Sequence, residues 1–225
     1  PTCRSDYAQG THHAASGLAI TCDSASANNY SFNYTPSAVT INRAALTVTP
    51  GAVTVTYGDV PNYSATVTGF VLSQTAATAT DYVAPTCAAN YSVGTHQSAS
   101  PLTISCINGS AADYSFNRTA TALLSITKRA LQLTVINKTK TYGDDDPANL
   151  GACTVSGGSV SSVDTLNGSC VVTRATGRNV GNYAITATDA SWTTGNSADY
   201  NLSFVAGNLE ITTRHLDITV ASPNL

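Results

Sequence analysis

Residues 1–35 read PTCRSDYAQGTHHAASGLAITCDSASANNYSFNYT, and residues 85–119 read PTCAANYSVGTHQSASPLTISCINGSAADYSFNRT. The two stretches align without a gap and are identical at 19 of 35 positions. Other landmarks recur along the chain: Tyr-Gly-Asp stands at 57–59 and 142–144, and an isoleucine that leads into an alternating run stands at 41, 126 and 211. Self-similarity at a fixed period indicates a tandem array, so we expect modules of about 85 residues.

The repeat is out of phase with the first and last residues of the sequence. We expect residues 1–44 to form the C-terminal part of a module, residues 45–129 and 130–214 to form two complete modules, and residues 215–225 to form the first strand of a following module. No Gly/Ser-rich or Pro-rich linker separates these parts, and the run 126–135 leads directly from one module into the next. The sequence therefore predicts stiff contacts between neighbouring modules of the same chain.

Short alternating runs dominate the chain and predict β-strands. Residues 45–49 read ALTVT, residues 131–135 read LQLTV and residues 216–220 read LDITV, with apolar side chains at every second position. This period is typical of strands that bury one face. Turn signals such as Tyr-Gly-Asp and Asn167-Gly168 stand between the runs. The sequence predicts an all-β fold of tandem immunoglobulin-like β-sandwich modules.

The composition excludes several classes of protein. Charged residues make up 10% of the chain and the formal net charge is −3, with no basic stripe, so we expect no nucleic-acid partner. No apolar run approaches the ~18 residues that a membrane-spanning helix needs, so we expect no membrane span. Glu210 is the only glutamate, and no aspartate lies in a recognisable catalytic setting. We therefore expect no enzyme, no catalytic residues and no cofactor.

The six cysteines form one pair in each module. They stand at Cys3 and Cys22, at Cys87 and Cys106, and at Cys153 and Cys170. The close Cys-x2–4-Cys spacing of zinc sites is absent, whereas an even count with one pair per repeat is typical of disulfides within modules. Disulfides persist in oxidising compartments, so the sequence predicts three disulfides and a secreted, cell-surface or extracellular protein.

The third module carries the motifs of a known family. It reads KTYGDDDP at 140–147, TRA at 173–175, NVGNYAI at 179–185 and DYNLSFVAGNLEIT at 199–212. This order resembles the MBG-type tandem repeat modules of bacterial surface adhesins, including filamentous-haemagglutinin-like proteins. The second module is similar to a cysteine-bearing variant of the same pattern. The resemblance implies export, tandem display and a stalk or scaffold role, and it implies no catalytic residues.

Three groups of side chains are candidates for metal or ligand sites. His12 and His96 occupy equivalent positions of the repeat, but Tyr183 aligns with them, so we expect packed rings and no metal site. The run Asp144–Asp146 offers carboxylates to calcium, although its spacing does not match an EF-hand loop. A solvated turn is the alternative interpretation. Trp192 is the lone tryptophan and lies outside the repeated landmarks, so it is the candidate for a ligand contact.

The sequence favours a structural stalk or scaffold of an exported adhesin or extracellular fibre. A carbohydrate-binding array with Trp192 as the contact is one alternative, and a spacer attached to a catalytic domain outside the sequence is another. The ligand, whether a glycan or a host surface, is not predicted.

The incomplete modules at 1–44 and 215–225 have two interpretations. One is that the sequence is a window cut from a longer array. The other is head-to-tail self-association, in which the strand at 215–225 completes the sheet at 1–44 of a second copy, as in donor-strand complementation.

Overall fold

The computed structural model describes residues 1–220, and residues 221–225 lie outside its described part. Within residues 1–220 the secondary structure consists of strands and three short 3₁₀ turns. The strands are β1 (Thr2–Arg4), β2 (Leu18–Asp23), β3 (Ser37–Val39), β4 (Ala44–Pro50), β5 (Val53–Thr56), β6 (Ala65–Thr68), β7 (Thr86–Ala88), β8 (Leu102–Ile107), β9 (Tyr114–Asn117), β10 (Ala122–Thr127), β11 (Arg129–Val135), β12 (Lys138–Thr141), β13 (Cys153–Gly158), β14 (Thr165–Arg174), β15 (Gly181–Thr194), β16 (Tyr200–Val205) and β17 (Gly207–Thr212). The 3₁₀ turns are η1 (His13–Ala15), η2 (Gln97–Ala99) and η3 (Ser197–Asp199).

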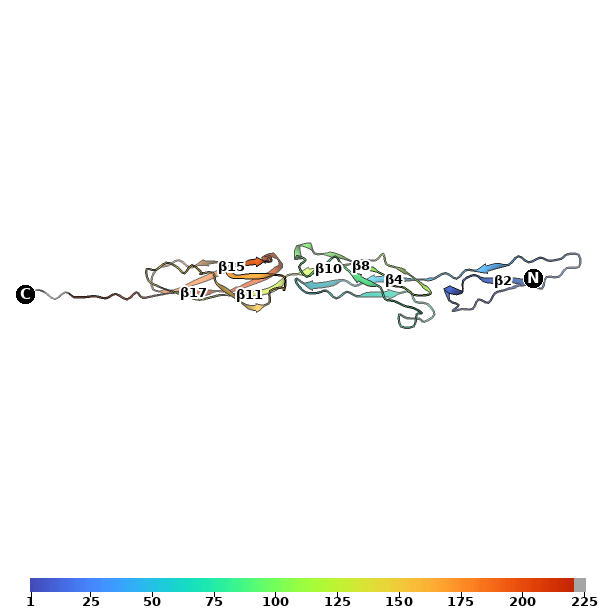
Figure 1. Cartoon of the computed structure of the whole chain (residues 1–225), viewed down its shortest axis with the longest axis horizontal. Coiled ribbons are helices and arrows are strands. Elements are labelled where there is room, and N and C mark those ends of the chain that lie inside the picture. Colours follow the sequence, from blue (N-terminus) through green and yellow to red (C-terminus); the bar gives the residue numbers. More distant parts are fainter. Residues whose placement is uncertain (221–225) are drawn as a thin grey trace, which may run out of the picture. The chain divides into compact units, whose positions relative to one another are not determined.

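The all-β fold predicted from the alternating runs is confirmed. The strands form several small sheets, and the modules they build resemble β-sandwiches (Figure 1). The finer immunoglobulin-like arrangement stays a prediction. No helix in residues 1–220 has the length and apolar character that crossing a bilayer would require.

The chain divides into two compact units. The first comprises Pro1–Val53, Asn62–Tyr91 and Pro101–Leu124, and the second comprises Thr54–Pro61, Ser92–Ser100 and Ser125–Leu225. Two segments of the expected 45–129 module therefore belong to the same compact unit as the expected 130–214 module. The module boundaries themselves stay a prediction. The candidate site lies where these two segments pack within the second unit.

The first unit contains the sheet β1-β2-β3 and the sheet β6-β4-β9. The alternation of β4 buries Leu46, which packs with Tyr114, and places threonines on the open face. Phe70, Tyr82 and Phe116 surround this pair and are partly buried. Aromatic rings thus supply much of the core of this unit, since they bury more apolar area than other side chains.

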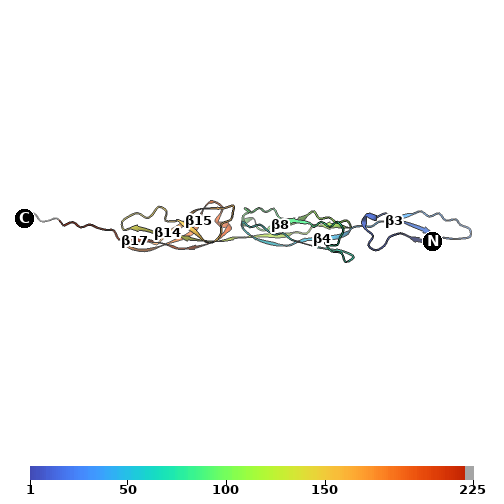
Figure 2. The same ribbon diagram turned by 60° about the horizontal axis from the view of Figure 1, so that its bottom comes forward.

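The second unit contains the sheet β13-β11-β16 and the sheet β12-β17-β15-β14. Figure 1 labels β11, β15 and β17 of this unit, and Figure 2 labels β14. One core cluster packs Leu133 with Cys153, Cys170 and Ala190, and a second contains Val135, Ile185, Leu209 and Ile211. Leu133 and Val135 are alternate residues of β11 and are each 1% exposed, so this strand contributes to both clusters.

The first strand of each complete module pairs in parallel with a late strand of that module. β4 pairs with β9 in the register Ala44 to Tyr114, and β11 pairs with β16 in the register Arg129 to Tyr200. A parallel pair needs a long crossover connection, which the rest of the module provides. The sequence predicted the strands but not this pairing.

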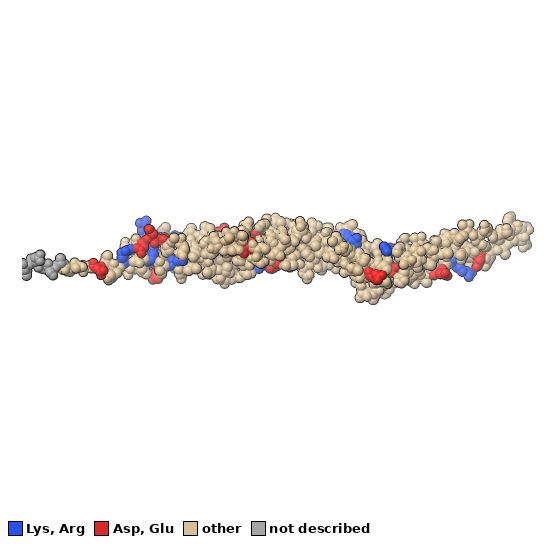
Figure 3. Space-filling model, in the orientation of Figure 1, with Lys and Arg blue, Asp and Glu red and all other residues tan. Residues whose placement is uncertain are grey.

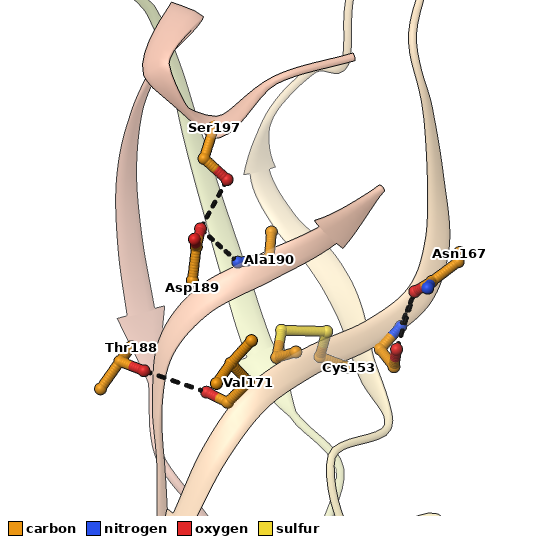
Figure 4. The surroundings of a disulfide bond; sticks show 9 residues. Cys153, Asn167, Val171, Thr188, Asp189, Ala190 and Ser197 are labelled. Carbon is orange, nitrogen blue, oxygen red and sulfur yellow. Dashed lines mark hydrogen bonds between the residues drawn. A yellow bond between two sulfur atoms is a disulfide. The ribbon is translucent and has the colours of Figure 1, made fainter. Parts of the chain in front are cut away.

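The three disulfides join the pairs of cysteines that the sequence groups together. Cys3–Cys22 and Cys87–Cys106 link directly opposed residues of neighbouring antiparallel strands, with Cα–Cα distances of 4.0 Å. Cys153–Cys170 differs, because β13 and β14 belong to different sheets and the Cα–Cα distance is 6.0 Å (Figure 4). The third bond therefore fastens one sheet of the second unit to the other.

The segment expected to start a following module forms no strand as far as Val220. Leu216, Ile218 and Val220 are 76%, 87% and 85% exposed. The rest of the expected 215–225 strand, residues 221–225, lies outside the described residues.

Candidate module-docking site

A polar cluster in the second unit centres on Tyr57. Its ring is 1% exposed. It stacks on His96 with a ring-centroid distance of 6.3 Å and meets Tyr200 edge-on at 5.7 Å. The hydroxyl of Tyr57 donates to Asp164 over 3.3 Å. Residues from three separate segments thus enclose one side chain, and we call Tyr57, His96, Asp164, Asp199 and Tyr200 the docking cluster.

Tyr200 forms the floor of the docking cluster. Its hydroxyl donates to Asp164 over 2.6 Å and accepts the backbone N–H of Ser161 over 3.0 Å. Burial, together with the neighbouring Asp164 carboxylate, raises the pKa of Tyr200 far above its ordinary value. The phenol is therefore a fixed neutral donor, since both burial and a nearby negative charge oppose its ionisation.

Asp199 is a buried carboxylate whose partners come from the segment Ser92–Ser100. Its side chain is 2% exposed and meets Nδ1 of His96 at 2.6 Å. The backbone N–H of Gln97, at the start of η2, donates to its second oxygen over 2.7 Å. A buried carboxylate is costly unless it is paired and hydrogen-bonded, so this acceptor holds the segment in one position.

Arg129 connects the Tyr-Gly-Asp turn to the first strand of the following module. Its Nε donates to the backbone carbonyl of Tyr57 over 2.7 Å, a second nitrogen pairs with Asp59, and a third donates to Ser159 over 3.1 Å. Only Lys128 separates β10 from β11, so this side chain acts where the chain passes between sheets. The planar guanidinium therefore holds both the backbone carbonyl of Tyr57 and the carboxylate of Asp59.

The turn at Gly58 requires glycine for two reasons. Its φ is +84°, and a Cβ at this position would collide with the side chain of Ser161. Gly143 has a similar φ of +90°, but a Cβ there would meet only Arg214, at an ordinary 3.5 Å. The two glycines are therefore a matched pair that separates backbone strain from a packing clash.

We expect Gly58→Ala to destabilise the second unit more than Gly143→Ala does. Both changes place alanine in the left-handed region, which costs about 1–2 kcal/mol. Gly58→Ala adds an overpacking cost of about 1–3 kcal/mol against Ser161. Urea unfolding followed by the fluorescence of Trp192, the only tryptophan, measures both variants. Equal losses in the two variants would show that the Ser161 contact can relax without cost.

The first unit contains a second version of the histidine–aspartate contact. His12 Nδ1 meets Asp113 at 2.6 Å, and the backbone N–H of His13 donates to the same carboxylate over 2.8 Å. Asp113 precedes Tyr114 as Asp199 precedes Tyr200. A pocket of roughly 290 Å³, lined in part by His12, Asp113 and Tyr114, lies beside this contact. The histidine–aspartate contact is therefore present in both copies of the repeat.

Acid is expected to weaken the Asp113 contact. The hydrogen bond with His12 holds the pKa of Asp113 below its ordinary 3.8, and burial opposes this only in part. A depressed folded-state pKa contributes stability that is complete above the unfolded-state pKa and is lost as the pH falls through the folded-state pKa. Asp113→Asn should remove about 1–3 kcal/mol near neutral pH and none once the wild-type carboxyl is protonated.

Amide hydrogen exchange in η1, measured against pH, tests this expectation. The His13 amide, which donates to Asp113, should exchange faster in Asp113→Asn at neutral pH, with the two proteins converging in acid. Asp23→Asn is the matched control, since its exposed carboxylate pairs with Arg4 on β1. A pH-independent difference between Asp113→Asn and wild type would contradict the assignment.

The second Tyr-Gly-Asp turn has the same clamp but an open ring. Arg214 Nε donates to the carbonyl of Tyr142 over 2.7 Å and pairs with Asp144, as Arg129 does with Tyr57 and Asp59. Tyr142 is 48% exposed, however. The turn and its arginine contacts therefore form even where no other segment covers the tyrosine ring. Whether the ring is buried, as in Tyr57, or exposed, as in Tyr142, depends on the segments that pack against it.

Two aspartates of the acidic run considered for calcium, Asp144 and Asp146, pair with cations. Asp146 meets Lys140 and Arg174, each at 2.8 Å, and these hydrogen bonds hold its pKa below the ordinary value. Figure 3 shows positive and negative side chains gathered together near the end of the second unit, on an otherwise sparsely charged face. In residues 1–220 no group of three or more His, Cys, Asp or Glu is placed to hold a metal ion. The arrangement is that of an ion-paired turn.

Trp192, the sequence candidate for a ligand contact, packs inside the second unit. Its ring stacks on Tyr200 at 4.7 Å, and its N–H donates to Ser197 over 2.8 Å. Ser197 in turn donates to Asp189 over 2.5 Å, a bond seen near the third disulfide in Figure 4. One face of the indole is covered by Tyr200, so the residue supports the floor of the docking cluster.

Comparison with known proteins identifies part of the chain. Residues 131–210 match the family model of the MBG domain (YGX type). The match is consistent with an MBG-type module in this part of the chain. The match contains the Tyr142-Gly143 pair of the second turn, together with both cysteines of the third disulfide. No curated protein and no solved structure matches the chain.

The MBG domain is a repeat module of extracellular proteins, and three disulfides are consistent with an oxidising compartment. Sequence reasoning found the Tyr-Gly-Asp turns and the repeated histidines, but it missed Asp199, Asp164 and Arg129 as members of one contact. Asp113 and Asp199 share a place in the repeat before a tyrosine, which was the available signal.

Proposed function

We propose that the chain is part of the structural stalk of an exported surface adhesin or extracellular fibre, in which tandem β modules are fixed to each other by docking clusters. The burial of Tyr57 to 1% exposure is the observation that carries the proposal. The residues that enclose it come from the expected 45–129 and 130–214 modules, within one compact unit.

The contacts of the docking cluster restrict rotation in more than one direction. The Tyr57 ring is held between two aromatic rings, Asp199 receives two hydrogen bonds from Ser92–Ser100, and Arg129 ties the turn to β11. Tyr57 and Asp199 are buried to 1% and 2% exposure, so these two side chains have little freedom to move. Such a junction transmits force from one module to the next, which is the task of a stalk.

The MBG-type match supports the stalk because these modules belong to extracellular repeat proteins. The proposal assigns the chain no catalytic role and no cofactor, and it is equally compatible with a spacer that holds a catalytic domain encoded elsewhere. It requires export, since the three disulfides need an oxidising compartment.

Small-angle scattering tests the stiffness that the proposal requires. The matched reference is a variant with a flexible Gly-Ser segment inserted after Lys128, between β10 and β11. The wild type should give a narrow distribution of particle dimensions, and the insertion should broaden it. A wild-type distribution as broad as that of the insertion variant would exclude a stiff stalk. Glycan binding that Trp192→Ala abolishes would favour the carbohydrate-binding alternative instead.

A further inference from the structure

The disulfide Cys87–Cys106 differs from Cys153–Cys170 in how a reagent can reach it. Cys87 lies in β7, an edge strand whose neighbour in the sheet is β8, and the residue is only partly buried. Cys106 on β8 is 5% exposed. Cys153 and Cys170 are 7% and 6% exposed and pack with Leu133 in a core cluster. A reagent in solution can therefore approach one end of the first bond, which we call the cross-strand bond. It can approach neither end of the second, which we call the inter-sheet bond.

The pairing register also distinguishes the two bonds. Cys87 lies directly opposite Cys106 in the antiparallel pair of β7 and β8, and their Cα atoms are 4.0 Å apart. Most disulfides join Cα atoms about 4.4–6.8 Å apart, and a bond outside that range is more easily reduced. The inter-sheet bond, at 6.0 Å, lies within the range. Cys3 and Cys22 have the same register and the same 4.0 Å separation, so the arrangement recurs in two copies of the repeat.

We propose that the cross-strand bond is a thiol-exchange site, which a small dithiol reduces in the folded protein while the inter-sheet bond stays closed. A thiolate of the reductant attacks Sγ of Cys87, forms a mixed disulfide there and displaces Cys106 as a thiolate, which takes up a proton. The second thiol of the reductant then attacks the sulfur of the first, closes a disulfide within the reductant and releases Cys87. The protein disulfide is thus reduced to two thiols, and the dithiol is oxidised to a disulfide.

Reduction of the cross-strand bond should loosen β7 locally. This strand is three residues long and pairs with β8, and the backbone bridge between Val83 and Ser110 lies nearby. So short a pairing is weak by itself, so the disulfide supplies much of the attachment. Both cysteines belong to the first unit, so we expect the second unit and its docking cluster to keep their contacts.

The inference does not rest on the stalk role. Exchange at Cys87 depends on the access of a reagent and on the register of β7 and β8. A stiff chain and a flexible chain would therefore react alike.

Reduction of the folded full chain tests the inference. The protein is incubated with dithiothreitol, thiols freed at successive times are alkylated with iodoacetamide, and peptide mapping gives the labelled fraction at each cysteine. Cys87 and Cys106 should be labelled about tenfold or more faster than Cys153 and Cys170, because access limits exchange. The rate at Cys87 should rise in proportion to the dithiothreitol concentration, as expected for direct attack on the folded protein.

Two controls separate the effect of the folded structure from that of the sequence. In concentrated urea both bonds are accessible, and they close loops of similar size with sequence separations of 19 and 17, so their rates should converge. Glutathione, a monothiol, should leave its adduct on Cys87, with Cys106 trapped by iodoacetamide. This adduct identifies the attacked sulfur.

Amide hydrogen exchange and fluorescence measure the consequence of reduction. The amides of β7 should exchange faster once the cross-strand bond is reduced, while Trp192 fluorescence keeps its native value. Equal labelling rates at the two bonds of the folded protein, or a glutathione adduct on Cys106, would overturn the inference. So would a rate at Cys87 that is independent of dithiothreitol concentration, since the first unit would then have to unfold before the bond reacts. Unchanged exchange in β7 would overturn the expected loosening.

Discussion

Replacing Tyr57 by alanine is expected to lower the free energy of unfolding of the second unit by about 3–5 kcal/mol. The ring is 1% exposed and is enclosed by His96 and Tyr200, so its removal leaves a cavity that rigid neighbours fill poorly. The loss also leaves Asp164 without one of its two hydroxyl donors. The effect belongs to the second unit because Thr54–Pro61 packs there.

Tyr142→Ala is the matched control for Tyr57→Ala. Both tyrosines begin a Tyr-Gly-Asp turn and both have their carbonyl held by an arginine. Tyr142 is 48% exposed, so its replacement should change stability by no more than about 0.5 kcal/mol. Trp192 reports on the docking cluster directly, since it stacks on Tyr200. Similar losses for the two variants, measured by the urea midpoint of Trp192 fluorescence, would mean that Tyr57 does not fix the junction.

The comparison of these turns shows how far sequence reasoning reaches. The triplet at 57–59 and the triplet at 142–144 are the same, and the residue types predict the turn in both. The sequence does not say which copy is buried, because burial depends on the surface that faces the ring.

The histidines illustrate a second limit. Their repetition at 12 and 96 predicted packed rings, whereas the His12 and His96 side chains are 59% and 56% exposed and meet Asp113 and Asp199 through Nδ1. The sequence did not indicate these two aspartate partners. His96 and Asp199 are 103 residues apart in sequence and meet only after both segments have folded. The aspartates carry a repeat signal of their own, since each precedes a tyrosine. Assigning each repeated histidine to its aspartate requires knowing which modules pack against each other.

The third disulfide was also predicted only in part from the sequence. One cysteine pair per repeat predicts Cys153–Cys170 as a bond. Only the sheet order shows that the two joined strands belong to different sheets, whereas the other two bonds link neighbouring strands. The mechanical meaning of a disulfide depends on that distinction, because a bond between sheets resists their separation.

Replacing both Cys153 and Cys170 by alanine is therefore expected to destabilise the second unit by about 3 kcal/mol through the lost chain constraint alone. The cysteines are 17 residues apart in sequence and are 7% and 6% exposed. They pack against Leu133 in one core cluster, so the smaller side chains add a cavity cost. The midpoint of the unfolding transition followed by Trp192 fluorescence should shift to lower urea concentration. The double variant should lose more stability than the wild type with the disulfide reduced, because reduction leaves both cysteine side chains in the core.

The double variant Cys87→Ala and Cys106→Ala is the control. Its bond closes a loop of similar size, with a sequence separation of 19, so the chain constraint that it supplies is nearly the same. Both of its cysteines belong to the first unit, and removing them should leave the Trp192 transition in place. If reducing agent or the Cys153/Cys170 double variant does not move that transition, the bond between the sheets is not what holds the second unit together. The two sheets must then be held by their apolar faces alone.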